Sequence, residues 1–124
     1  MLKERGYTVL KREDGSEVEL LFRTWTFKRF CELNGDITYQ QMIEVLTAGI
    51  GIKHMAQLLL CASEYYHIKN KKPFAYTDFD ACEWIDELGG LNAAAFVDVI
   101  GVMTAALVDS GATVKEDKKK AVSS

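Results

Sequence analysis

The chain has few of the features that mark disulfide-linked, metal-binding or exported proteins. Its three cysteines, Cys31, Cys61 and Cys82, lie far apart and form no Cys-x-x-Cys pair, so we expect neither a disulfide framework nor a zinc site. The N-terminus lacks the apolar core of a signal peptide. These absences predict a cytoplasmic protein with reduced thiols and no bound cofactor.

The chain also has no charge excess that would select a polyanionic partner. Its 18 acidic residues face 15 lysines and arginines, for a net charge of −3, which gives no overall attraction to nucleic acid or to an anionic membrane. The basic cluster of Lys69, Lys71 and Lys72 has no interleaved aromatic residues for base stacking. We therefore expect neither nucleic acid nor a membrane as a partner.

The chain length and apolar content suit one globular domain. Its 124 residues are 48% hydrophobic, which suffices for a continuous core but is too short for two comfortable domains. We place this domain at residues 1–111. Residues 112–124 are polar and lysine-rich without an apolar period, and we predict that they form a disordered tail.

A β-hairpin is predicted over residues 7–22. Asp14-Gly15 suits a two-residue type I′ turn, and β-prone residues lie on both sides of it. This turn places Arg12 opposite Glu17, an opposite-charge pair that stabilises neighbouring strands. The face predicted to be buried consists of Tyr7, Val9, Val18, Leu20 and Phe22.

Helical periodicity covers most of residues 24–110 and predicts about five helices after the hairpin. Asn34-Gly35 suits a left-handed C-cap for the first helix, and Thr38 and Thr77 are capping residues that open later helices. The predicted fold is therefore mainly α (α+β), an N-terminal hairpin followed by a helical bundle. Its predicted core is built on Phe30, Leu58, Leu59, Trp84, Phe96, Ile100 and Met103.

Trp25 lies off the apolar side of the first predicted helix, on the same side as Arg29. The helix start signal is Thr24 or Thr26. If Thr26 is the N-cap, Trp25 precedes it and packs against Phe30 in a hydrophobic staple. In the other interpretation Trp25 remains partly exposed as an aromatic anchor for a partner.

The last predicted helix, over about residues 92–109, is apolar or small nearly all round. A membrane span is disfavoured because Asp98 lies in mid-segment and alanines are frequent. The side of the helix opposite its large residues comprises Ala94, Gly101, Ala105 and Val108. Either packing within the chain consumes this small side, or the side accepts a helix from a second copy or from another protein.

Catalytic and metal-binding patterns are weak. His54 and Cys61 share a helix face, but two helical turns separate them. We therefore interpret Cys61 as a buried structural cysteine and not as half of a thiol-imidazole pair. No metal-ligand spacing surrounds His67. The acidic residues near Trp84 lack the central glycine of a calcium loop, and we interpret them as a solvated helix face. We expect no enzymatic activity.

A series of short motifs follows the predicted hairpin. It consists of a Phe, an aromatic residue, an Arg-Phe-x-x-Leu motif and a Gly two residues after the Leu. These residues are Phe22, Trp25, Arg29, Phe30, Leu33 and Gly35. The arrangement resembles the small tail assembly chaperones of long-tailed bacteriophages and prophages. The later part is also similar, with a long apolar helix, a basic loop, a Thr-x-x-Asp cap and an acidic helix containing Trp84-Ile-Asp86. The likeness covers about residues 5–109.

The resemblance implies a non-enzymatic, mainly helical protein of the bacterial host cytoplasm. Proteins of this family bind the long tape measure protein before the tail tube forms, and many carry a C-terminal extension that recruits tail tube protein. The partner-binding residues expected here are Trp25, Arg29, Ala94, Gly101, Ala105 and Val108. The alternatives left open are a small cysteine- or metal-dependent enzyme and a DNA-binding regulator.

Overall fold

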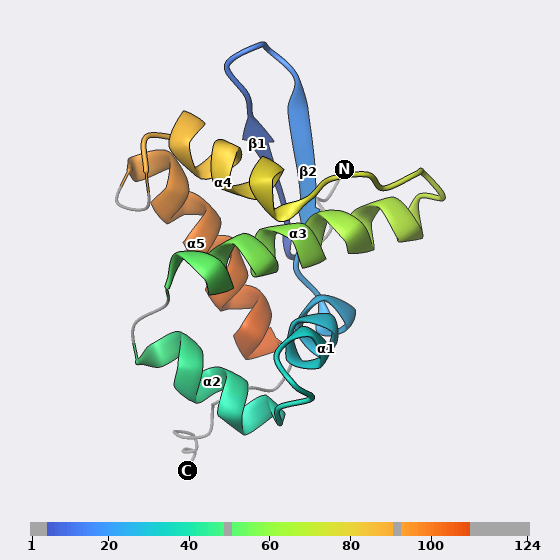
Figure 1. The fold of residues 1–124 in the computed structure, drawn as a ribbon, viewed down its shortest axis with the longest axis vertical. Helices are drawn as coiled ribbons and strands as arrows, with labels where there is room; N and C mark the ends of the chain where they lie inside the picture. Colours follow the sequence, from blue (N-terminus) through green and yellow to red (C-terminus); the bar gives the residue numbers. More distant parts are fainter. Residues whose placement is uncertain (1–4, 49–50, 91–92, 110–124) are drawn as a thin grey trace.

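The computed structural model is an N-terminal two-stranded hairpin followed by five helices, as predicted (Figure 1). It describes residues 5–48, 51–90 and 93–109, so the tail predicted at 112–124 lies outside the described residues. The elements are β1 (Tyr7–Lys11), β2 (Glu17–Leu21), α1 (Thr24–Leu33), α2 (Tyr39–Thr47), α3 (Ile52–Lys69), α4 (Asp78–Glu87) and α5 (Ala94–Asp109). Helix α3 is central, because β2, α1 and α4 all pack against it.

The hairpin register differs by one residue from the predicted register. Lys11, and not Arg12, lies opposite Glu17. The amide of Gly15 donates to the carbonyl of Arg12 (3.0 Å), and the amide of Arg12 donates to the carbonyl of Ser16 (2.9 Å). With Gly15 at φ +89°, the turn has three residues and ends on a left-handed glycine, so the predicted two-residue type I′ turn is wrong.

This shift changes which side chains of β1 face the core. Because side chains alternate along a strand, a slip of one residue exchanges the two faces of that strand. Leu10 is buried, whereas Val9, predicted for the buried face, is only half-buried. On the other strand and just after it, Val18, Leu20 and Phe22 are buried as predicted.

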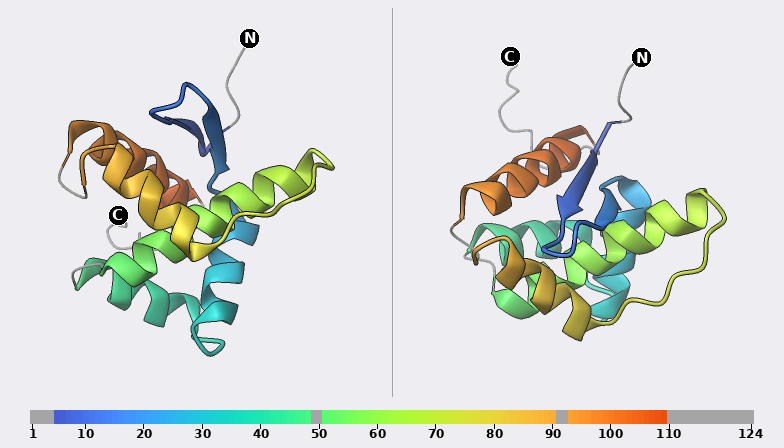
Figure 2. Two further views of the ribbon diagram at one scale, coloured as in Figure 1. Left: turned by 45° about the horizontal axis from the view of Figure 1, so that its top comes forward. Right: turned by 90° about the horizontal axis from the view of Figure 1, so that it is seen from above.

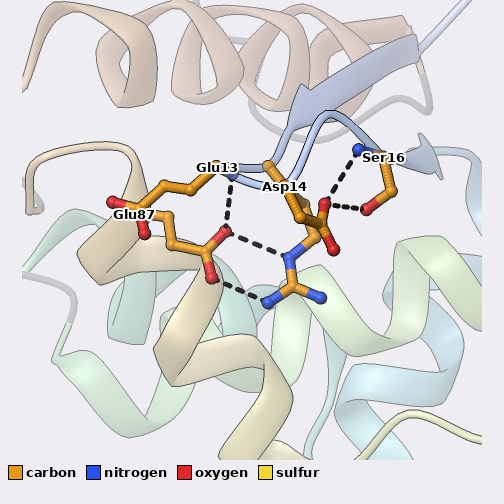
Figure 3. Close-up of polar contacts among 5 residues, drawn as sticks. Glu13, Asp14, Ser16 and Glu87 are labelled. Carbon is orange, nitrogen blue, oxygen red and sulfur yellow. Dashed lines mark hydrogen bonds and ion pairs between the residues drawn. The ribbon is translucent and has the colours of Figure 1, made fainter.

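The longer turn lets Arg12 reach Glu87 of α4, and Figure 3 shows Glu87 close to Glu13 at the turn. The guanidinium of Arg12 donates from Nε to Oε1 of Glu87 (3.0 Å) and from a terminal nitrogen to Oε2 (2.7 Å). The backbone amide of Glu13 also donates to Oε1 of Glu87 (3.3 Å). These hydrogen bonds, with that from Arg12 the strongest, lower the pKa of the Glu87 carboxyl below its ordinary value. The hairpin tip is thereby fixed to the C-terminal end of α4.

Helix α1 begins at Thr24 with Arg23 as its N-cap, so the interpretation of Thr26 as the cap is wrong. Thr26 is fully buried in the first turn. Its Oγ1 donates to the carbonyl of Leu21 (2.6 Å) and accepts from the amide of Arg23 (3.2 Å). The hydroxyl thus joins the end of β2 to α1. At the other end of the helix, Gly35 has φ +86°, as the predicted left-handed C-cap requires.

The caps of two further helices are confirmed. The Oγ1 of Thr38 accepts from the amide of Gln41 (3.0 Å), whose side chain accepts from the amide of Thr38 (2.8 Å). Thr77 and Asp80 form the same reciprocal pair at the start of α4. The predicted core residues are all buried except Ile100, which is partly buried at the edge of the core.

Candidate functional site

Helix α5 presents an exposed and nearly uncharged face. In the right-hand view of Figure 2 the helix lies along the outer edge of the molecule. Seven of its exposed residues recur with heptad spacing and form what we call the outer face of α5: Ala94, Val97, Asp98, Gly101, Thr104, Ala105 and Val108. The opposite stripe is buried and comprises Phe96, Val99, Met103, Ala106 and Leu107.

Two valines on this face are exposed to solvent. Val97 retains 55% of its accessible surface and Val108 retains 51%. Asp98 is the one charged residue among the seven. Of the two interpretations of the small side of this helix, consumption by packing within the chain is therefore wrong for the outer face, and the four predicted residues Ala94, Gly101, Ala105 and Val108 are accessible to a partner.

An apolar groove lies beside the outer face, between α2 and α5. Its volume is about 250 Å³, and its lining comprises Ile43, Leu46, Thr47, Ile100, Met103, Thr104, Leu107 and Val108. Thr104 and Val108 belong both to this α2–α5 groove and to the outer face of α5. None of the described residues that line it is charged, so an apolar group can enter without desolvating an ion of these residues. The sequence gives no sign of this groove, because α2 and α5 meet only through the tertiary fold.

The structure places Trp25 and Arg29 on another surface, against α3. The Trp25 ring stacks on that of Tyr65, with ring centroids 5.6 Å apart and planes 19° apart. Arg29 forms an ion pair with Glu64 at 3.5 Å. Because α1 begins at Thr24, Trp25 lies inside the helix and not before its cap, so the predicted hydrophobic staple is wrong. The expected partner-binding residues are therefore divided between two surfaces.

The candidate thiol-imidazole pair is not assembled. Cys61 is buried, and this burial raises the pKa of its thiol to about 12. The ring of His54 packs edge-on against Phe30, with centroids 5.8 Å apart. A thiol that ionises near pH 12 supplies almost no thiolate nucleophile at neutral pH.

The basic loop after α3 has aromatic neighbours that the sequence pattern does not reveal. The Nζ atom of Lys72 lies 5.3 Å from the ring centroid of Tyr66, and this ring packs on that of Tyr7 at 6.0 Å. His67 accepts or donates through Nδ1 at 2.7 Å from the carbonyl of Ser63. Tyr7 comes from the hairpin, far away in sequence, so only the fold brings it to the loop.

Comparisons of the chain with protein-family models, with curated proteins and with solved structures give no match. Within residues 5–48, 51–90 and 93–109, no helix is long and apolar enough to cross a membrane. The same residues contain no group of three or more His, Cys, Asp or Glu side chains that could hold a metal ion. We take as the candidate functional site the outer face of α5 together with the α2–α5 groove, because exposed and nearly uncharged residues adjoin an apolar groove there.

Proposed function

We propose that this chain is a tail assembly chaperone of a long-tailed bacteriophage or prophage. In this role it binds a helical segment of the tape measure protein in the host cytoplasm and catalyses no reaction. The observation that carries the proposal is the outer face of α5, where seven exposed residues include a single charge. The hairpin followed by five helices is the order of elements that the resemblance implies.

The geometry of this face suits a client helix. Its residues span 14 helical steps, or about 21 Å, which matches about four turns of a docked helix. Gly101 has no side chain, and the space that a Cβ would occupy there is open, so a client backbone can approach closely at the centre. Apolar side chains of the client can enter the α2–α5 groove, in the way that amphipathic helices place anchors in a hydrophobic groove.

The charge distribution fits a partner that must be released later. The α5 face carries Asp98 as its one charge, so binding through it desolvates few ions. A face about 21 Å long is small compared with permanent interfaces, and small interfaces form exchangeable complexes. A chaperone that is absent from the finished tail needs such a contact, because tail tube protein must displace it.

Trp25 and Arg29 form the second surface of the proposal. The stacked rings of Trp25 and Tyr65 are both half-buried, so they offer a rigid aromatic edge at little further cost in side-chain entropy. Arg29 is beside them, joined to Glu64. We assign this surface to a second segment of the tape measure protein, or to tail tube protein.

The alternative of a cysteine-dependent enzyme has less support. Cys61 is 1% exposed, and burial keeps its thiol protonated. A DNA-binding regulator would depend on Lys69, Lys71 and Lys72, which are exposed at the end of α3 and in the loop after it. It would bind DNA with a strong dependence on salt concentration.

The proposal is tested by co-expression with the long, coiled-coil-rich protein that a tail gene cluster encodes nearby. A complex should form that Gly101→Glu weakens at least tenfold, because a charged side chain at the closest approach would be buried without a partner (about 2 kcal/mol or more). Ala95→Glu is the matched control, since Ala95 is exposed on α5 but lies outside the outer face. Equal binding by the two variants would refute the α5 surface, and failure of the parent chain to bind would refute the function.

A further inference from the structure

The outer face of α5 carries both a protruding side chain and a recess that could receive it. Val97 protrudes four residues before Gly101, with 55% of its surface exposed. The α2–α5 groove opens on the same flank of the helix, and its lining from α5 runs from Ile100 to Val108, from one residue before Gly101 to seven residues after it. The protruding side chain thus lies before Gly101 and most of the recess lies after it. A twofold axis beside Gly101 would place each Val97 level with residue 105 of the other copy, within the span of its groove.

We propose that a second copy of this chain binds to this face, with the two α5 helices antiparallel and Gly101 at the twofold axis. Each Val97 then enters the α2–α5 groove of the other copy. The groove of about 250 Å³ has room for a branched aliphatic side chain, since a cavity of about 150 Å³ accepts benzene. Such an interface is isologous, because the same patch on each copy supplies both parts.

The position of the groove selects the antiparallel arrangement. In an antiparallel pair the twofold axis lies between the two helices and is perpendicular to them. It therefore keeps each flank of α5 opposite the same flank of the second copy. Val97 and the groove share a flank, so they meet. In a parallel pair the axis runs along the helices and brings opposite flanks together, which places each Val97 beside Asp98 of the other copy and leaves both grooves empty.

The other residues of the face are compatible with this register. Ala94 of one copy lies opposite Val108 of the other, so a small residue meets a larger one. Gly101 meets Gly101, which permits close approach of the backbones. The two Asp98 residues lie three steps on either side of the axis, about 9 Å apart along the helices, at the edge of the contact where water screens them.

This dimer goes beyond the proposed function and does not depend on it. The second copy and a client helix would occupy the same surface, so each would exclude the other. A dimer would cover the apolar face until a client displaces it. Because the contact is about 21 Å long, it belongs with the small interfaces that form weak complexes.

Sedimentation velocity of the full chain alone tests association. We expect a monomer–dimer equilibrium with a dissociation constant in the micromolar range. Val97→Asp should weaken it at least about tenfold, because the carboxylate would enter an apolar groove, whereas Ala95→Asp should leave it unchanged. A chain that remains monomeric at several hundred micromolar, or two variants that associate equally, would overturn the proposal.

Disulfide trapping tests the register in a Cys82→Ser background, which removes the exposed native thiol. The double variant Val97→Cys with Val108→Cys should give a covalent dimer on mild oxidation. Each single variant should not, because equivalent positions lie about 12 Å apart for residue 97 and about 21 Å apart for residue 108, beyond disulfide reach. A covalent dimer from Val108→Cys alone would show the parallel arrangement and contradict the proposal.

Discussion

Thr26→Val should destabilise the protein more than its small change in shape suggests. The Oγ1 of Thr26 is fully buried, donates to the carbonyl of Leu21 at 2.6 Å and accepts from the amide of Arg23 at 3.2 Å. Valine has the same shape but lacks the hydroxyl, so both backbone groups lose their side-chain partner. The hydrogen-bonded connection between β2 and the first turn of α1 is removed.

The magnitude follows from the unsatisfied groups. A buried acceptor that loses its hydrogen-bond donor costs about 1–3 kcal/mol, and we assign most of the effect to the carbonyl of Leu21, because Leu21 is buried and Arg23 is only partly buried. We expect a loss of about 2 kcal/mol in the free energy of unfolding. For a domain of this size about 4 °C corresponds to each kcal/mol, so the melting temperature should fall by about 8 °C.

Thr26→Ser is the matched control in thermal and urea unfolding followed by circular dichroism. Serine keeps the hydroxyl and loses one methyl group, which costs about 0.8 kcal/mol. The valine variant should therefore be the less stable of the two. If the valine variant is as stable as the parent chain, or more stable than the serine variant, the assigned role of the hydroxyl is wrong.

Glu87→Gln should make the free energy of unfolding less dependent on pH in the acid range. Hydrogen bonding from Arg12 lowers the pKa of Glu87 in the folded protein. The stability that ionised Glu87 contributes is therefore complete above its ordinary pKa of 4.5 and is lost as pH falls through the folded pKa. Melting temperatures between pH 6 and pH 3, compared with the parent chain, measure this effect. Gly6→Ala should cost more than about 1 kcal/mol in urea unfolding, because Gly6 has φ +81° and an added Cβ would collide with a backbone carbonyl of the residue after β2. In the native state Cys82, which is exposed, should react with a thiol reagent much faster than the buried Cys61, whose thiol pKa is about 12; equal rates, followed by absorbance, would contradict the burial of Cys61.

The sequence was sufficient for the order of elements and for several of their ends. Thr38 and Thr77 accept hydrogen bonds from amides three residues on, so each cap is a local interaction that local sequence can specify. The hairpin was also predicted, but its register was not. Asp14-Gly15 fits a two-residue turn and also a three-residue turn. The three-residue turn is joined to α4 through Arg12 and Glu87, and a local sequence pattern cannot show this contact.

The candidate site was predictable only in part. The helical period shows that Gly101 and Ala105 share a side away from the large residues of α5. The exposure of that side and the groove beside it depend on where α2 lies. Trp25 illustrates the same limit, because its stacking partner Tyr65 is 40 positions away in the chain. Such contacts result from the packing of α1 on α3.

The central claim is that the outer face of α5 binds a helical client. Its most direct test is hydrogen–deuterium exchange of the chain with and without the proposed client, a tape measure protein, at a concentration where the free chain is monomeric. Binding should slow the local opening of α5, so the amides of residues 94–108 should become protected while those of α4, residues 78–87, exchange as before. A stable complex in which α5 exchanges at its free rate would contradict the account.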